Sequence, residues 1–274
     1  MNLIFLFVFP LGFPDHLFDC GNTTSLKNRH QEGKEDQMIE PIQSDSLRDI
    51  FIQKFERLIF SGYFKIGERL PPERQLARML GVSRPVVHEG LVNLVSKGLV
   101  TMTPRKGSVI NDYRKEGSLF VLTSLFEYSD GQVSERLLAS MLDMRMLVEV
   151  ENVGLAATNR SQSQVAQLQE IVDREGQVDP DDIKGIAALD FEFHHLISIA
   201  SDNLVYPLLL NSLKQFYISL TEKFFADRSV IPWVLEHHGK IVGAIHDQSV
   251  EKAKEYTKKL LAHGERHLRA ILKT

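Results

Sequence analysis

The chain has 274 residues, of which 43% are hydrophobic, and its formal net charge at pH 7 is −4. This length is enough for two ordinary domains, each with its own hydrophobic core. The single cysteine, Cys20, excludes an internal disulfide framework and a cysteine-based metal cluster, so the composition favours a protein of the reducing cytoplasm.

The charges are divided unevenly along the chain. Residues 51–110 contain ten Lys and Arg against four Glu, a net charge of +6, which leaves −10 for the remainder. A basic first domain joined to an acidic second one is typical of a DNA-binding region followed by a regulatory region.

The first 40 residues differ from the rest. Met1–Phe18 is apolar and aromatic, but it has no basic start, contains Pro10 and Pro14, and is too short to span a membrane. A polar, charged stretch follows. We expect residues 1–40 to form a disordered extension, with Met38 as the true start of the protein; an anchor in the membrane interface is the alternative.

Three helices and a β-hairpin are predicted after this extension from apolar spacing and capping residues. The helices are expected over residues 45–60, 73–80 and 84–97. Two short β-rich runs, 99–103 and 108–110, flank the basic sequence Pro104-Arg105-Lys106-Gly107. Three helices followed by a hairpin indicate a winged helix-turn-helix, which we place within residues 41–112.

The remainder, residues 117–274, is predicted to be an all-helical bundle, because its apolar residues recur with helical periodicity. A short polar linker over residues 111–117 precedes it. Helices are expected over residues 118–127, 132–158, 161–175, 180–201, 203–226, 229–247 and 249–272. The predicted fold class is therefore mostly α, with a small β-hairpin wing.

Two stretches carry a family resemblance. The sequence GERLPPERQLARMLGVSRPVVHEGL, which begins at Gly67, closely resembles the winged-helix signature of the GntR family of bacterial regulators. The second half resembles the FCD effector domain of the FadR-like branch of that family. Its matching positions are Arg145, Glu149, Asp190-x-x-x-His194, Ala200-Ser-Asp-Asn203 and His238-x-x-Ile241-x-x-Ala244-Ile245. Together the resemblance covers residues 43–272.

The resemblance implies that the third helix enters the major groove of DNA and that the wing tip reaches the adjacent groove. The residues it assigns to DNA are Arg74, Ser83, Arg84, Pro85, His88, Arg105, Lys106 and Gly107. Arg84 starts the third helix, where recognition helices carry base-reading side chains, and arginine can bond bidentately to guanine. The family commonly has an arginine where this chain has His88, so this contact is altered or pH-sensitive here.

A candidate metal site lies in the second half. Asp190 and His194 are four residues apart on one predicted helix, and His238 on a later helix can converge with them in a bundle core. Such a set suits Zn²⁺, Ni²⁺ or Mn²⁺. Metal-binding FCD domains usually have a further histidine, for which this chain has Leu260, and His263 one turn later is an imperfect substitute. A metal-free polar cluster that lines an apo or acyl-chain pocket is the alternative.

The resemblance places Arg145 in the same cavity, where its guanidinium can hold a carboxylate effector. An ion pair with Glu149, four residues later, is the alternative role of Arg145. Glu149 and Asn203 are expected to complete the effector site. The run from Asn203 to Tyr217 is also similar to the fatty acyl-CoA-responsive members of the branch, although its apolar residues suit plain core packing equally well.

We therefore expect a ligand-responsive transcription regulator, repressor or activator, that binds a palindromic double-stranded DNA operator as a homodimer. Its effector is expected to be a small carboxylate metabolite, with a fatty acyl-CoA as the alternative. A hydrolase that uses Asp190, His194 and His238 as a metal centre is the rival from another class. We do not favour an enzyme, because the sequence contains no nucleophile motif, phosphate loop or cofactor fingerprint. A membrane-tethered protein would rest on residues 1–18 alone.

Overall fold

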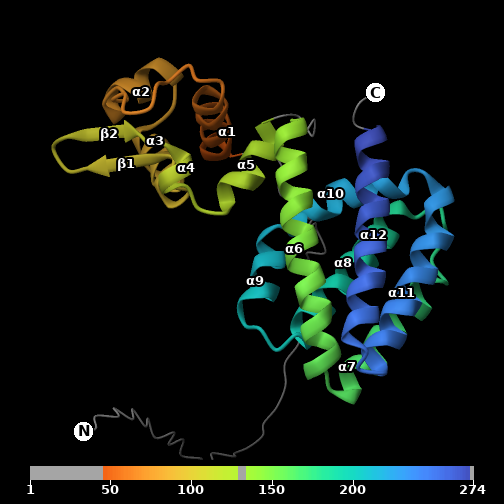
Figure 1. Cartoon of the computed structure of the whole chain (residues 1–274). Coiled ribbons are helices and arrows are strands. Elements are labelled where there is room, and N and C mark those ends of the chain that lie inside the picture. The colour runs from red at the N-terminus through yellow and green to blue at the C-terminus, as the bar shows by residue number, and fades with distance from the viewer. Residues whose placement is uncertain (1–45, 129–133, 272–274) are drawn as a thin grey trace, which may run out of the picture. The chain divides into compact units, whose positions relative to one another are not determined.

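The computed structural model describes residues 46–128 and 134–271, and the predicted extension over residues 1–40 lies outside these ranges (Figure 1). Buried apolar side chains form two separate cores in the described part. The first draws on residues between Phe51 and Val121, and the second on residues between Leu138 and Leu268. The helices within the described ranges lack the apolar length that a membrane crossing requires.

The predicted winged helix-turn-helix is confirmed by the order of the first elements. These are α1 (Leu47–Phe60), α2 (Glu73–Leu80), α3 (Arg84–Ser96), β1 (Val100–Thr103) and β2 (Gly107–Ile110). The two strands are antiparallel, with Val100 opposite Ile110 and Thr103 opposite Gly107. Gly81 ends α2 in the left-handed region, at φ 67°, which a glycine reaches without strain.

Helices α1 and α3 approach each other closely. Phe51 and Phe55 of α1 stack with their ring centroids 4.2 Å apart, and both are buried with Leu91 of α3. A Cβ atom at Gly90 of α3 would lie 2.2 Å from the Phe51 ring. The absence of a side chain at Gly90 therefore allows α3 to pack on α1 with its other face exposed.

The predicted linker contains a helix that the sequence analysis did not predict. Asp112 accepts a hydrogen bond from the backbone N–H of Arg114 and starts the single turn α4 (Tyr113–Glu116). The next helix, α5 (Phe120–Tyr128), packs on α1. Ser124 of α5 and Lys97, at the end of α3, both donate to the buried Glu56 carboxylate, at 2.8 and 2.6 Å. Aspartate at an N-cap position explains the extra turn.

The second region is all-helical within the described residues, as predicted. It comprises α6 (Glu135–Asn159), α7 (Gln162–Glu175), α8 (Ile183–Ala200), α9 (Val205–Ser212), α10 (Lys214–Phe225), the 3₁₀ turn η1 (Arg228–Val230), α11 (Ile231–His246) and α12 (Val250–Ile271). The expectation of one helix over residues 203–226 is wrong. Leu213 leaves the helical conformation, with φ −105° and ψ 5°, and separates α9 from α10. The apolar spacing continues across this break, so periodicity does not reveal it.

Helices α6, α8 and α11 place polar side chains in the interior of this region. Helix α6 packs along α12 and α8, and α11 packs on α12 and α7, as the adjacent α6, α11 and α12 in Figure 1 show. Glu149, Asp190 and His238 are buried together with apolar residues such as Phe193, whose ring stacks on His238 with centroids 4.0 Å apart. Charged groups held in such an apolar interior need partners, because water cannot solvate them.

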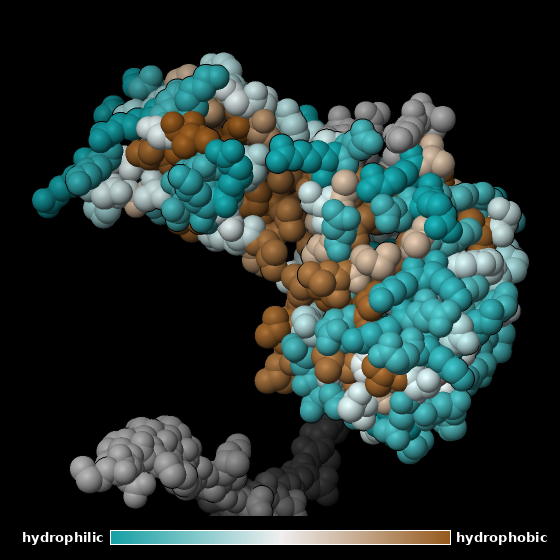
Figure 2. Space-filling view, viewed as in Figure 1, coloured by the Kyte–Doolittle hydropathy of each residue, from teal (hydrophilic) through white to brown (hydrophobic). Residues whose placement is uncertain are grey.

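Helix α9 carries an exposed apolar surface. Leu204, just before the helix, Val205 and Leu208 are 85%, 65% and 66% exposed. Figure 2 shows hydrophobic residues gathered at the edge of the helical region where Figure 1 places α9. Apolar exposure of this extent on neighbouring residues is typical of a protein contact surface.

Candidate DNA interface and effector site

A basic groove lies between the wing and the start of α2 and α3. It encloses about 1590 Å³ of empty space, part of it open to solvent. Its charged lining residues are five cations and one anion: Arg69, Arg74, Arg84, Arg105, Lys106 and Glu73. The structure thus brings together Arg74, Arg84, Arg105, Lys106 and Gly107, which the sequence analysis assigned to DNA, and adds Arg69. Figure 2 shows hydrophilic residues over the wing.

The wing tip is held in shape by backbone geometry and by Arg69. Arg105 and Gly107 have φ values of 64° and 88°, and the Lys106 N–H donates to the Thr103 carbonyl at 3.0 Å. Arg69 Nη1 donates to the Lys106 carbonyl oxygen at 3.1 Å. The backbone of Arg69 also forms an isolated antiparallel β-bridge with Val109 of β2. The role of Arg69 was missed, because only the fold brings it to a hairpin 37 residues away.

The start of α3 is organised by a glutamate from α2. Arg84 Nε donates to Glu73 Oε2 at 3.0 Å, and His88 Nδ1 lies 2.8 Å from Glu73 Oε1. The hydrogen bond with His88, and to a smaller extent that with Arg84, lowers the pKa of Glu73 against the effect of its partial burial. Ser83 occupies the predicted N-cap position, but its side chain makes no capping hydrogen bond, and Pro85 lies in the first turn.

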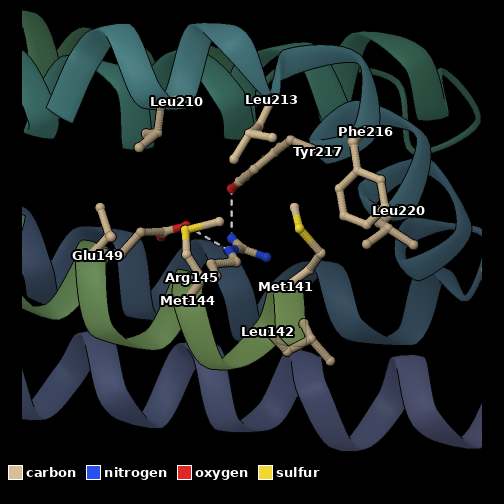
Figure 3. A pocket seen from close by; sticks show the side chains of 11 residues that line it. Met141, Leu142, Met144, Arg145, Glu149, Leu210, Leu213, Phe216, Tyr217 and Leu220 are labelled. Carbon is tan, nitrogen blue, oxygen red and sulfur yellow. Dashed lines mark hydrogen bonds and ion pairs between the residues drawn. The ribbon is translucent and has the colours of Figure 1, made fainter. Parts of the chain in front are cut away.

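The interior of the helical region contains a chain of polar groups. Arg145 Nε donates to Glu149 Oε1 at 2.6 Å, and Arg145 Nη2 donates to the Tyr217 hydroxyl at 2.6 Å (Figure 3). That hydroxyl in turn donates to Asp190 Oδ2 at 2.8 Å. Arg145 therefore makes the predicted ion pair with Glu149 and also contacts, through Tyr217, a residue of the candidate metal site.

Both histidines of the candidate metal site are oriented by carboxylates. His194 Nδ1 lies 2.6 Å from Glu149 Oε2, and His238 Nδ1 lies 2.9 Å from Glu175 Oε2. A carboxylate that binds Nδ1 leaves Nε2 as the ligand atom, the arrangement found around metal-bound histidines. The Nε2 atoms of His194 and His238 are buried and make no hydrogen bond within the described residues.

These charges shift one another's ionisation. Burial by itself raises the pKa of Glu149, but the charges of Arg145 and His194 outweigh it and lower that pKa to about 2. Burial lowers the pKa of His238, yet the Glu175 carboxylate produces a net rise. Burial raises the pKa of Tyr217 well above its ordinary value, so its hydroxyl stays protonated and donates to Asp190.

The three predicted ligands converge, and the fourth does not. Asp190, His194 and His238 each offer one ligand atom within 4.8 Å of the others, and all three are buried. The two Nε2 atoms, neither of which makes a hydrogen bond within the described residues, and an aspartate oxygen are a donor set that Zn²⁺ or a similar ion can use; His238 Nε2 lies 3.8 Å from Asp190 Oδ1. His263 instead stacks on Trp233, with ring centroids 4.1 Å apart. Leu260 lines a small cavity with Asp190 and His194, so an apolar residue takes the place of a fourth ligand.

A second cavity adjoins this site on the side of Arg145. It is small and partly open to solvent, and Figure 3 shows side chains from α6, α9 and α10 around it. Its apolar lining consists of Met141, Leu142, Met144, Val148, Leu210, Leu213, Phe216 and Leu220. Arg145, Glu149 and Tyr217 supply its polar groups. The cavity thus combines a long apolar wall with one positively charged group.

Asn203 and Glu175 lie differently from what the sequence predicts. Asn203 lines neither cavity, because its Oδ1 accepts hydrogen bonds from the N–H groups of Val205 and Tyr206 at the start of α9. The roles of Glu175 and Tyr217 were missed. Glu175 is 63 residues from His238 in the sequence, so no local pattern could pair them.

Comparisons with known proteins agree with this organisation. Residues 51–110 match the gntR family of bacterial regulatory proteins, and residues 140–263 match the FCD domain. The chain is similar to YcbG, an HTH-type transcriptional regulator of Bacillus subtilis (strain 168), with 28% identity over 81% of this chain and 90% of that protein. It is also similar to the fatty acid metabolism regulator protein of Serratia proteamaculans (strain 568), with 25% identity over 71% of this chain and 79% of that one.

A solved structure shares the fold. The structure of Lar, which controls the expression of the Listeria monocytogenes agr system and mediates virulence, has a TM-score of 0.56 and 14% identity. The similarity covers 83% of this chain and 99% of that one.

Proposed function

Because the chain belongs to the GntR family of bacterial regulatory proteins and carries an FCD domain, we propose that it is a ligand-responsive regulator that binds a palindromic operator as a homodimer. Members of this family are DNA-binding transcription regulators rather than enzymes. In this proposal, effector binding in the helical region changes the affinity of the winged helix for DNA.

The basic groove is the observation that carries the DNA-binding part of the proposal. Five cations line it beside the exposed start of α3, and one of them, Arg84, has a side chain that is 72% exposed. Lysine and arginine side chains neutralise phosphates, and an arginine at the start of a recognition helix reads base edges. We assign base reading to Arg84 and phosphate contacts to the wing residues Arg105 and Lys106.

The exposed apolar surface at α9 supports a contact with a second copy of the chain. Leu204, Val205 and Leu208 are more exposed than buried, and a two-fold dimer would cover the same patch on both copies. We expect Leu208→Glu to yield monomers in sedimentation velocity. Met79→Glu, which changes an exposed apolar residue of α2, should leave the dimer intact. If the Leu208→Glu protein remains dimeric, the dimer interface does not include the apolar surface at α9.

The effector site is proposed to hold a carboxylate beside a divalent transition metal ion. Asp190, His194 and His238 would hold Zn²⁺, Ni²⁺ or Mn²⁺ through one oxygen and two Nε2 atoms. When bound, such an ion would supply a Lewis acid for an effector carboxylate. Arg145 would bind that carboxylate by charge-assisted hydrogen bonds, in exchange for its present bonds to Glu149 and Tyr217.

A fatty acyl effector is the second candidate, and the apolar cavity favours it. The cavity wall is formed almost entirely by Leu, Met, Val and Phe side chains, and its charged end is Arg145. Methionine side chains such as Met141 and Met144 adapt to flexible apolar chains. Several curated relatives of similar sequence, including that of Serratia proteamaculans, are fatty acid metabolism regulators.

Native mass spectrometry with metal analysis of the protein purified from cells separates the two candidates. About one transition metal ion per chain in a dimer supports the metal-dependent carboxylate effector. A metal-free dimer with a co-purified acyl-CoA supports the second candidate. A protein that carries neither, and that takes up neither Zn²⁺ nor palmitoyl-CoA on titration, would contradict both.

The metal assignment has its own test with matched variants. Glu175→Gln removes the carboxylate that orients His238 and should weaken Zn²⁺ binding about 10- to 100-fold, the usual effect of losing such a partner. Glu170→Gln, on the exposed face of the same helix, is the control. Leu260→His should strengthen Zn²⁺ binding by adding a third imidazole as the fourth ligand, whereas His263→Gln should change nothing. Equal Zn²⁺ affinity in all four variants would contradict the assignment of Asp190, His194 and His238 as metal ligands.

A further inference from the structure

We propose that the small cavity beside Asp190 and His194 selects a monocarboxylate with a short apolar tail, and that α12 forms the wall that holds this tail. This inference rests on the proposed function, because it takes a carboxylate as the effector. It deepens that function by naming the class of carboxylate, and it assigns the space for the tail to Gly264.

The lining of this cavity has a polar side and an apolar side. Arg145, Asp190 and His194, from α6 and α8, form the polar side, and Arg145 is the only lysine or arginine of the lining within the described residues. The apolar side comes from α10, α11 and α12 and consists of Phe224, Val234, Leu260, Leu261 and Leu268. A ligand that fills this cavity therefore needs a negatively charged head and an uncharged, apolar body.

Helix α12 presents successive turns to the cavity. Leu260, Gly264 and Leu268 are spaced by four residues, so they lie along one face of the helix. Leu260 and Leu268 are both buried. Leu260, which takes the place of a fourth metal ligand, thus offers apolar surface to a tail instead of a ligand atom to an ion.

Gly264 leaves room between these two leucines. A Cβ atom at this position would meet no atom within 4 Å, whereas a Cβ atom at Gly90 would collide with the Phe51 ring. Gly264 therefore does not serve the close packing of two helices, as Gly90 does. A side chain at position 264 would extend into the cavity, so the glycine keeps the space for the tail open.

The apolar side disfavours a second charged or strongly polar group on the ligand. Thr221 supplies the only hydroxyl of the lining within the part of the chain that the structure describes. A second carboxylate held among the leucines would lose its water and gain no cation in return, which is strongly unfavourable. Dicarboxylates and sugar acids therefore fit this cavity worse than a simple monocarboxylate does.

The small size of the cavity limits the length of the tail. A long acyl chain needs the other cavity, which Met141 and Leu213 line on the far side of Arg145 from Asp190. A competing explanation is that a short tail also lies in that other cavity. A second one is that the space beside Gly264 is a packing defect that binds nothing. Variants at Gly264 distinguish these explanations, because Gly264 lines only the cavity beside Asp190.

The experiment is isothermal titration calorimetry of the full chain, with and without one equivalent of Zn²⁺, against acetate, propionate, butyrate and succinate. Affinity should rise about fourfold with each methylene group from acetate to butyrate, the gain expected for burying a CH₂ group. Succinate equals butyrate in carbon number but ends in a second carboxylate. It should bind about 100-fold more weakly than butyrate, or weaker still.

Gly264→Val fills the space for the tail and should lower the affinity for butyrate about tenfold, close to that for acetate, while the affinity for acetate stays the same. Gly264→Ala should give a smaller decrease. The matched control is Gly243→Val, on the exposed face of α11, where a Cβ atom also meets no atom within 4 Å. This control should keep the wild-type series, and circular dichroism confirms that each variant is folded.

Equal affinities of wild type for acetate, butyrate and succinate would overturn the inference. An unchanged series in Gly264→Val would also overturn it, because the tail would then lie outside this cavity. If no carboxylate binds either with or without Zn²⁺, the proposed carboxylate effector is wrong, and the inference falls with it.

Discussion

Two glutamates in this chain each hold one arginine and one histidine, but in opposite surroundings. Glu73 contacts Arg84 and His88 at the surface of the winged helix, where the two partner side chains are 72% and 54% exposed. Glu149 contacts Arg145 and His194 in the helical region, where the exposed fractions are 23% and 2%. The residue types are the same, but the exposure of their side chains to water differs strongly.

This difference gives the two clusters different roles. At the surface, water competes for every charge, so the contacts order side chains without adding much stability. In the interior, each charge depends on its partner, because a buried charge without one is strongly destabilising. A ligand can therefore replace the contacts of the exposed Glu73 cluster at little cost. In the buried Glu149 cluster, a ligand that displaces Glu149 from Arg145 must itself supply a negative charge, as a carboxylate does.

The largest expected effect is the loss of the buried partner. Glu149→Gln leaves Arg145 and His194 without their carboxylate and should lower the free energy of unfolding by about 3 kcal/mol or more. Urea unfolding at pH 7 measures this change. The matched control is Glu151→Gln, on the same helix, whose ion pair with Lys254 is 49% exposed on the glutamate side.

The same experiment compares the two clusters. Glu151→Gln and the surface variant Glu73→Gln should each change the free energy of unfolding by no more than about 1 kcal/mol. A similar loss of stability in Glu149→Gln and Glu73→Gln would show that burial does not separate the two clusters.

The next largest expected effect is a difference between wild type and Glu149→Gln in how the free energy of unfolding falls at acid pH. The pKa of Glu149 is lowered to about 2 from its ordinary value of 4.5, so this group stabilises the fold above pH 4.5 and loses that contribution as the pH falls towards 2. A difference of this size corresponds to about 3 kcal/mol over that range. We expect wild type to lose more unfolding free energy between pH 5.5 and 3 than Glu149→Gln does. Parallel pH curves for the two proteins would contradict the assigned ionisation.

The sequence predicts the winged helix well because each boundary there has a local chemical cause. Gly81 ends α2, and Pro85 lies in the first turn of α3, so both helices were placed to within a residue. Helices α9 and α10 lack such a signal, since the break at Leu213 falls inside an uninterrupted apolar pattern. Propensity and periodicity therefore locate helices but not every change in their direction.

The residues of the candidate metal site also differ in how far the sequence can predict their contacts. Asp190 and His194 could be paired from their spacing on one helix, and family resemblance added His238. Glu175 could not be paired with His238, because their contact depends on how α7 packs against α11. The sequence therefore indicates the candidate ligands but not the carboxylate that fixes the orientation of His238.

The smallest expected effect is on DNA affinity, and it distinguishes a base contact from a phosphate contact within the winged helix. Arg84→Ala should weaken binding to the operator by about 1–3 kcal/mol while binding to random DNA changes little. Lys106→Ala, at the wing tip, should weaken both equally and reduce the slope of log affinity against log salt by about 0.9, as expected when one phosphate contact is lost. Fluorescence anisotropy over a salt series measures both quantities. If Arg84→Ala reduced operator and random binding equally, Arg84 would be a phosphate contact, and the exposed glutamate cluster would position a docking residue rather than a reader.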